Sequence, residues 1–181
     1  SLVAATWHYN ACTKNVPTYE HSYSNVIDTT CDTCGATREL PYDSYGTTGD
    51  CYWYLEGTKL TITGNGKFVS AHKPEDLKGE IMYFVCTSEG SLLVLNDCQI
   101  DVTHLGNIQG SKVVQAQSKG KVIINGGEYV RAGDDMRGDY ALVYAMSGAH
   151  IEVNGGIFQN AGTNYALLNV NKGKPGSILV N

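Results

Sequence analysis

The chain has 181 residues, 42% of them hydrophobic, and a formal charge of −5 with a pI near 5.4. This acidic balance leaves no basic surface for a nucleic-acid partner, and no run approaches the ~18 consecutive apolar residues of a membrane span. With 21 Gly and 12 Tyr against only 3 Phe, the composition favours a folded core built from strands and turns.

The cysteine count and the first residue bear on the setting of the protein. Six cysteines are an even number, which favours an extracellular, oxidising environment. The chain starts at Ser1 rather than Met. That start fits a mature chain without its leader, an excised fragment or a cloning boundary.

Residues 1–45 form a Cys/His-rich, irregular N-terminal segment without repeats. Its informative stretch begins at His21 and ends with a C-x-x-C-G knuckle, in which Gly35 lets the backbone fold back so that both sulfurs point to one place. Two interpretations stay open. A structural zinc would take four ligands from His21, Cys31, Cys34 and Cys12. Disulfides among Cys12, Cys31, Cys34 and Cys51 would instead staple a segment too small to hold a core.

The same stretch resembles a short module, H-x-Y-x-N-x-C-D-x-x-C-x-x-C-G-x-x-R, that occurs in tandem in large surface proteins of anaerobic bacteria. Ile27 takes the place of the first cysteine of that pattern, and Cys12 with the two residues before it resembles the missing piece, displaced upstream. The resemblance implies a bacterial protein that is secreted or lies at the cell surface.

Residues 46–181 are expected to form a second unit that starts with a hairpin. Alternation in residues 52–55 and 60–63 predicts two strands joined around Gly57. The stretch resembles the G-x-x-G-D…W-x-L…G-x-L-T-I-x-G-x-G hairpin that introduces repeat regions in secreted bacterial surface proteins. We expect it to cover the end of the repeat region that follows.

The repeat is clearest near the C-terminus, where GKVIINGGEYV, GAHIEVNGGIF and GSILVN begin at Gly120, Gly148 and Gly176, 28 residues apart. Period-2 alternation predicts that apolar positions on either side of one residue face a shared core. Aligned copies then give two inward columns, Leu60, Leu93, Val122, Ile151, Ile178 and Ile62, Leu95, Ile124, Val153, Val180. A turn column reads Thr63, Asn96, Asn125, Asn154, Asn181, and a third apolar column reads Phe68, Ile100, Tyr129, Phe158.

This pattern, over residues 57–181, resembles the right-handed parallel β-helix of the pectin-lyase-like proteins, in particular versions with an NGG-x-aromatic turn in surface proteins of anaerobic bacteria. The resemblance implies an all-β fold with a short right-handed parallel β-helix of about four rungs. A β-propeller or a β-sandwich is the alternative. The resemblance specifies the fold and leaves the function open, because the same fold carries lyases, adhesins and inert stalks.

The loops between strands hold the only candidates for catalysis. One loop carries the groups that acidic-sugar chemistry needs, Arg131, Asp134, Asp135, Arg137 and Asp139, with His104 expected one rung away. No carboxylate recurs at the equivalent place on adjacent rungs. We therefore expect a solvated charged loop and no catalytic residue.

Other features concern packing and association. Cys86 and Cys98 are expected to be buried or to pair across rungs. The outward column reads Thr61, Val94, Ile123, Glu152, Leu179, and its apolar neighbours Val94 and Ile123 predict a cover, either the N-terminal segment or a partner. Residues 176–181 begin a further rung, which predicts an interface formed by Ile178, Leu179, Val180 and Asn181, or a fragment of a longer chain.

The leading hypothesis is a non-catalytic extracellular structural or adhesion module of a bacterial surface protein or filament. It would associate with itself through open β-helix ends or with neighbouring domains of a longer surface chain, and would need no cofactor beyond the possible structural zinc. The alternative is a carbohydrate-binding or polysaccharide-cleaving protein that contacts a glycan through exposed tyrosines and Trp53.

Overall fold

The fold is described from a computed structural model, in which residues 21–69, 82–103, 112–131, 141–160 and 166–181 are described. Cys12, His104 and the acidic residues of the predicted loop, Asp134, Asp135 and Asp139, lie outside the described residues, as does Arg137.

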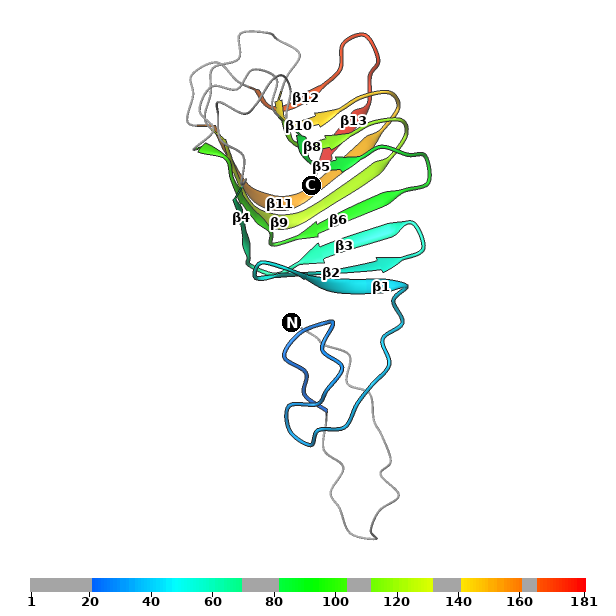
Figure 1. The fold of residues 1–181 in the computed structure, drawn as a ribbon. Coiled ribbons are helices and arrows are strands. Elements are labelled where there is room, and N and C mark those ends of the chain that lie inside the picture. Colours follow the sequence, from blue (N-terminus) through cyan, green and yellow to red (C-terminus); the bar gives the residue numbers. More distant parts are fainter. Residues whose placement is uncertain (1–20, 70–81, 104–111, 132–140, 161–165) are drawn as a thin grey trace, which may run out of the picture.

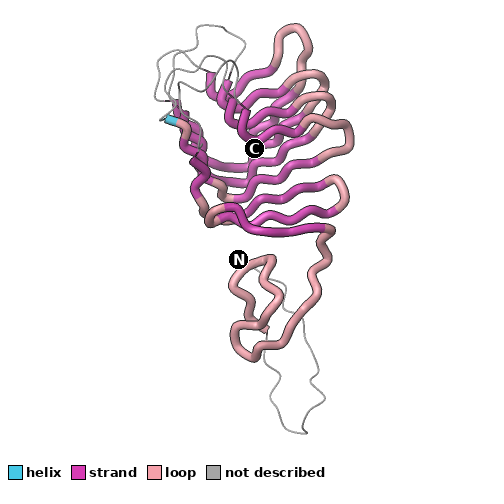
Figure 2. Tube along the Cα trace, in the orientation of Figure 1, coloured by secondary structure: helices cyan, strands magenta, loops and turns pink. Residues whose placement is uncertain are grey.

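The described regular structure is almost entirely β, which confirms the all-β prediction (Figures 1 and 2). The strands are β1 (Ser44–Thr48), β2 (Cys51–Glu56), β3 (Lys59–Thr63), β4 (Lys67–Val69), β5 (Met82–Cys86), β6 (Leu92–Asn96), β7 (Gln99–Asp101), β8 (Lys112–Ala116), β9 (Lys121–Arg131), β10 (Ala141–Ala145), β11 (His150–Asn160), β12 (Ala166–Val170) and β13 (Ser177–Val180). Among the described residues, no helix has the length and apolar character that crossing a membrane requires.

The strands form two sheets that face each other across the core (Figure 1). One has the order β1-β2-β3-β6-β9-β11-β13, with β4 and β7 beside it, and the other has the order β12-β10-β8-β5. From β3 onward all pairs are parallel, and the chain passes from one sheet to the other and back. Only β1-β2 and β2-β3 are antiparallel.

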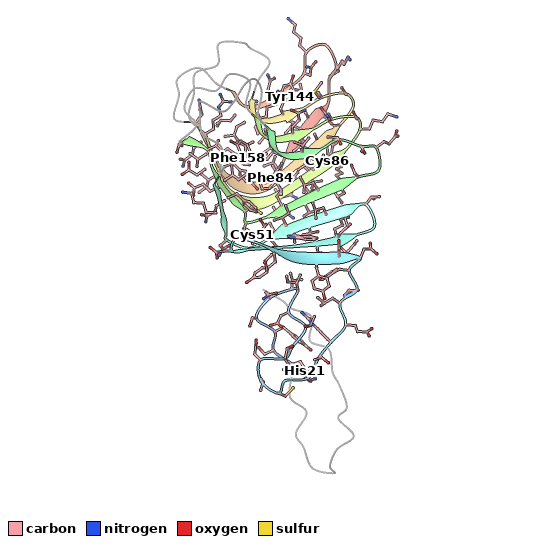
Figure 3. All side chains as sticks on the ribbon, in the orientation of Figure 1. His21, Cys51, Phe84, Cys86, Tyr144 and Phe158 are labelled. Atoms are coloured by element: carbon pink, nitrogen blue, oxygen red, sulfur yellow. The ribbon has the colours of Figure 1, made fainter. Side chains whose placement is uncertain are left out.

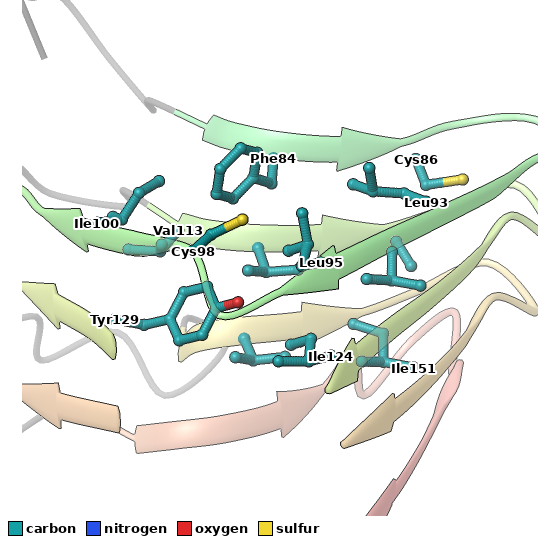
Figure 4. Packing of buried hydrophobic residues seen from close by; sticks show 14 of the residues in the cluster. Phe84, Cys86, Leu93, Leu95, Cys98, Ile100, Val113, Ile124, Tyr129 and Ile151 are labelled. Carbon is teal, nitrogen blue, oxygen red and sulfur yellow. The ribbon is translucent and has the colours of Figure 1, made fainter. Parts of the chain in front are cut away.

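The strand register confirms the predicted columns residue by residue. Leu60, Leu93, Val122, Ile151 and Ile178 are aligned on successive strands, and so are Ile62, Leu95, Ile124, Val153 and Val180. The third column, Phe68, Ile100, Tyr129 and Phe158, is also aligned. Its last two rings stack with centroids 5.1 Å apart. The side chains of these columns fill the space between the sheets (Figures 3 and 4).

The turn column forms a hydrogen-bonded ladder of asparagine side chains. Each Nδ2 donates to the Oδ1 of the asparagine one rung earlier: Asn125 to Asn96 at 2.8 Å, Asn154 to Asn125 at 2.9 Å and Asn181 to Asn154 at 2.5 Å. In β9 the second glycine of the NGG turn is Gly127, whose φ is 101°. Only glycine fits there, because a Cβ would collide with the carbonyl oxygen of Cys98. The NGG turn therefore lets neighbouring rungs approach closely.

Candidate functional site

The two sheets end at β12 and β13, which have no strand on their outer side among the described residues. We call the apolar side chains at this edge the open end: Phe158, Leu168, Val170, Ile178 and Val180. Each is the last member of an aligned column. Val143 and Ala145 on β10 precede Leu168 and Val170 in register, and Val153 precedes Val180.

Exposure changes abruptly along these columns. Val180 is 58% exposed, whereas Val153 is 4% and Ile124 0% exposed. In the other sheet Leu168 is 37% exposed and its neighbour Val143 is 0%. These residues have the side chains of core positions, but no rung among the described residues covers them as it covers the earlier members of each column. Full burial of a side chain of this size is worth about 1.5–3 kcal/mol.

Backbone groups add to the open end. Asn181 N–H donates to the carbonyl of Val153 at 3.0 Å, and Ser177 N–H donates to that of Ala149 at 2.9 Å. The inner side of β13 is therefore paired, while its outer side presents unpaired groups to a further strand. The predicted interface residues Ile178, Leu179, Val180 and Asn181 all belong to this edge, with Leu179 on the outward column and 48% exposed.

The opposite end is built differently, and we call the β1-β2 hairpin the capped end. The register continues the two inward columns into Leu55 and Trp53 of β2 and then into Ser44 and Gly46 of β1. Trp53 packs against the core, and a Cβ at Gly46 would lie only 2.9 Å from its ring. The columns thus finish in small residues on a polar, exposed strand.

Strand β1 was not anticipated from the sequence, which placed residues 1–45 in an irregular segment. It pairs with β2 across a two-residue turn, Gly49-Asp50, with Gly49 at φ 58°. Because Gly at a position of positive φ in a two-residue turn is a hairpin signal, the short polar run 44–48 could have been assigned as a strand. The predicted hairpin around Gly57 is confirmed as β2-β3.

The structure brings together three of the four predicted metal ligands, His21, Cys31 and Cys34, in the segment before β1. Cys34 Sγ lies 3.3 Å from His21 Nδ1. Burial raises the pKa of Cys31, but hydrogen bonds from His21 and from the backbone and side chain around Cys34 outweigh it and lower this pKa to about 6. The fourth predicted ligand, Cys12, lies outside the described residues.

The described cysteines, Cys31, Cys34, Cys51, Cys86 and Cys98, are free in this structure, and the predicted disulfides stay a prediction. Three of them, Cys51, Cys86 and Cys98, fill the core as small apolar side chains. Their thiols donate to carbonyl oxygens, such as Cys51 Sγ to Gly66 at 3.4 Å. Burial raises the pKa of Cys98 to about 12, so this group stays a thiol.

The predicted outward patch, Val94 and Ile123, is less exposed than an outward position of a sheet would be. Val94 is 8% exposed, its neighbour Thr61 is 1% exposed, and Ile123 is half-buried. The described part of the N-terminal segment lies beyond β1 rather than over β6 and β9, so it does not supply the predicted cover (Figure 1). Little of Val94 is left for a partner to contact.

Clustered ionisable groups line a small hollow beside β4, β7 and β9, at Lys67, Asp101 and Glu128. The sequence analysis did not single out Lys67 or Asp101, although register places both beside the predicted third column. Lys67 Nζ lies 2.9 Å from Asp101 Oδ2, and the hydroxyl of Thr103 donates to the other oxygen at 2.6 Å. These hydrogen bonds hold the pKa of Asp101 well below its usual range. The carboxylate therefore serves as the centre of a local ion pair rather than as a general acid.

Arg131, the one described member of the predicted charged loop, is buried at 1% exposure. Comparison of the chain with protein-family models, curated proteins and solved structures finds no match. Its function has to be inferred from the geometry of the open end, the capped end and the His/Cys cluster.

Proposed function

We propose that this chain is a non-catalytic structural module that associates with a second copy of itself through the open end. In this proposal residues 57–181 form a right-handed parallel β-helix of about four rungs, and the module belongs to a bacterial surface or secreted protein. The observation that carries the proposal is the step in exposure along aligned columns, from 4% at Val153 to 58% at Val180.

The surface that best fits the open end of one molecule is the open end of a second copy. A strand edge binds a further strand through backbone hydrogen bonds, and apolar side chains next to it supply the affinity. The capped end is a poor partner, because β1 ends the inward columns in Ser44 and Gly46, and its exposed apolar residue, Tyr45, lies on the outward column. Contact between two identical surfaces is isologous and closes as a two-fold dimer. The geometry therefore favours a closed dimer over the head-to-tail filament expected from the sequence.

The test is the mass of the full chain in solution across protein concentration, by sedimentation or light scattering. We expect a dimer that dissociates on dilution, and we expect Val180→Asp to shift the chain to monomer because it places a charge in the apolar contact. Tyr45→Asp, at an exposed apolar residue of the capped end, is the matched control and is expected to leave the dimer intact. A monomer at every concentration, or equal sensitivity to both variants, contradicts the proposal.

A second candidate, carbohydrate binding or cleavage, is favoured by the hollow at Lys67, Asp101 and Glu128. It is the weaker candidate, because the Asp101 carboxylate is already engaged by Lys67 and Thr103. A screen of acidic and neutral polysaccharides for binding and cleavage tests it. Activity that Glu128→Gln abolishes without unfolding the chain would replace the structural proposal with this one.

A further inference from the structure

The described part of the segment before β1 has defined turns but few buried apolar side chains. Among its described residues only Tyr23 and Cys31 are buried apolar side chains, at 7% and 2% exposure. A chain segment of this size cannot bury enough surface to fold by the hydrophobic effect, and such segments usually depend on disulfides or a bound metal. Its two described cysteines are free, so a disulfide between them does not supply the order.

Three side chains of this segment converge on one point. His21, Cys31 and Cys34 each place one ligand atom so that the three atoms all lie within 4.8 Å of one another. A tetrahedral zinc ion with bonds of about 2.3 Å to sulfur and 2.0 Å to nitrogen separates a sulfur from a nitrogen by about 3.5 Å and two sulfurs by about 3.8 Å. The 3.3 Å between Cys34 Sγ and His21 Nδ1 is close to the first of these separations.

The backbone around the two cysteines has the form of a tight knuckle. Gly35 N–H donates to the Cys31 carbonyl at 2.9 Å, and Cys31 N–H donates to the Ala36 carbonyl at 2.8 Å. Gly35 sits at φ 72°, a conformation that a glycine adopts without strain. Thr30 and Thr37 close the knuckle as an antiparallel bridge. This turn fixes both sulfurs on one side before any ligand is bound.

A separate set of polar contacts holds His21 beside the knuckle. Asp32 N–H, inside the knuckle, donates to the carbonyl of Ser22 at 2.8 Å, and the Ser24 hydroxyl donates to the Asp32 carboxylate at 2.9 Å. These bonds join the stretch that carries His21 to the turn that carries the cysteines. The imidazole is therefore placed by its neighbours and not by the His21–Cys34 contact alone.

Arg38 braces the loop between these two parts. Its guanidinium lies 3.7 Å from the centroid of the Tyr23 ring, and its Nε donates to the carbonyl of Asp28 at 2.8 Å. Its Nη2 also donates to the carbonyl oxygen of Val26 at 3.2 Å, which holds the same loop in place. The segments that carry the three ligand residues are thus held in place by surrounding contacts, as is usual at metal sites.

We propose that His21, Cys31 and Cys34 bind a single zinc ion that holds the N-terminal segment in its fold. Two thiolates and an imidazole select a borderline-soft ion such as Zn²⁺ over Ca²⁺ or Mg²⁺, which prefer oxygen ligands. Cys34 is exposed, and His21 is partly exposed, so the site is open to a fourth ligand. This inference is independent of the proposed dimer.

The test uses the full chain, reduced and freed of metal, and titrated with Zn²⁺ against a chromophoric chelator. We expect one tightly bound equivalent. Co²⁺ as a spectroscopic substitute should give the near-ultraviolet charge-transfer absorption of thiolate ligands and the visible bands of a tetrahedral site. Cys31→Ser, Cys34→Ser and His21→Ala should each weaken binding about tenfold or more, because each removes one ligand.

Cys86→Ala is the matched control, since its column already carries alanine at Ala116 and Ala145. It removes a thiol from the core and is expected to leave zinc binding unchanged. Far-ultraviolet circular dichroism of every variant checks that the repeat region stays folded. The proposal is overturned if the reduced wild-type chain binds no zinc at micromolar concentration, if Co²⁺ gives no thiolate absorption, or if the three ligand variants bind as tightly as the control.

Discussion

The capped end and the open end terminate the same columns in opposite ways. Among the described residues both ends have strand edges without a partner, including β1 at the capped end and β12 and β13 at the open end. At the capped end the column of Ile62 passes through Trp53 and finishes at Gly46. At the open end the same column finishes at Val180, which is 58% exposed.

The difference shows that an unpaired strand edge does not by itself define an interface. Backbone groups are available at both ends, but only the open end combines them with exposed apolar side chains in core register. A polar edge strand over a large aromatic ring is one of the ways in which β proteins avoid adding further strands. Side chains, rather than hydrogen-bonding capacity, therefore distinguish the end that is closed from the end that binds.

The largest effect is expected from Trp53→Ala, which removes the ring that covers the capped end. Because Trp53 packs both on the core and under Gly46, we expect a loss of about 3 kcal/mol in the free energy of unfolding. The variant also gains a second apolar end and should form species larger than a dimer. Urea denaturation and sedimentation measure the two effects, and Tyr45→Ala serves as the control. An unchanged mass distribution would mean that the ring does not keep this end closed.

A second variant gives the open end the residue types that terminate the columns at the capped end. Ile178→Ser with Val180→Gly ends the columns in the residue types of Ser44 and Gly46. We expect the dissociation constant of the dimer to rise by about 100-fold, which corresponds to about 2.8 kcal/mol. Lys174→Ser, at an exposed residue just before β13, is the control. If the double variant dimerises like wild type, the open end is not the interface.

The asparagine ladder allows a substitution in an interior rung to be compared with one in the last rung. Asn125 is hydrogen-bonded to asparagines on both sides, Asn96 and Asn154, whereas Asn181 has an asparagine partner on one side only and a longer bond of 3.4 Å to Glu152. We expect Asn125→Ala to lower the free energy of unfolding by about 1–2 kcal/mol and Asn181→Ala by less than about 1 kcal/mol. Chemical denaturation of the two variants at one protein concentration checks the order. Equal losses would show that position in the ladder does not matter.

The smallest effect concerns acid stability near the capped end. Thr103 and Lys67 lower the pKa of Asp101 in the folded state, so the ionised form stabilises the fold. This contribution is complete above the unfolded-state pKa of about 3.9 and is lost as the pH falls through the lower folded-state pKa. We expect Asp101→Asn to cost about 1 kcal/mol or less at pH 7 and to flatten the decline of stability below about pH 4.

A matched pair of positions controls this acid effect. At the open end, Ile157 and Gln159 are the register equivalents of Lys67 and Asp101, and they carry no charge. Gln159→Asn should therefore leave the pH profile of stability unchanged. If Asp101→Asn keeps the wild-type profile, its ion pair with Lys67 contributes nothing to acid stability.

Much of the fold could be predicted because the same pattern of inward-facing side chains recurs in each repeat. The inward columns, the asparagine turn and the Phe68–Phe158 column follow from a period of two and a recurring NGG turn, and the register agrees with each of them. Strand β1 was missed because its polar run 44–48 has no apolar alternation. The handedness of the coil and the number of rungs remain predictions.

The sites were less predictable, because they depend on distances between residues that are far apart in the sequence. An even cysteine count predicts disulfides but not which cysteines lie close together, because that depends on the packing, which places Cys51, Cys86 and Cys98 in the core. The convergence of His21 with the knuckle of Cys31 and Cys34 was one of two possibilities in the sequence. The low exposure of Val94 agrees with the predicted cover, but the sequence did not identify what supplies it.

The asparagine ladder has a consequence for how the chain folds. It fixes the register of neighbouring strands to the residue, since a slip of one position would turn every side chain to the wrong face. It cannot tell one rung from another, because Asn96, Asn125, Asn154 and Asn181 present the same amide. A rung from another molecule would be accepted as readily as the chain's own. Exchange of rungs between molecules is therefore the misfolding that this chain must avoid when it folds at high concentration.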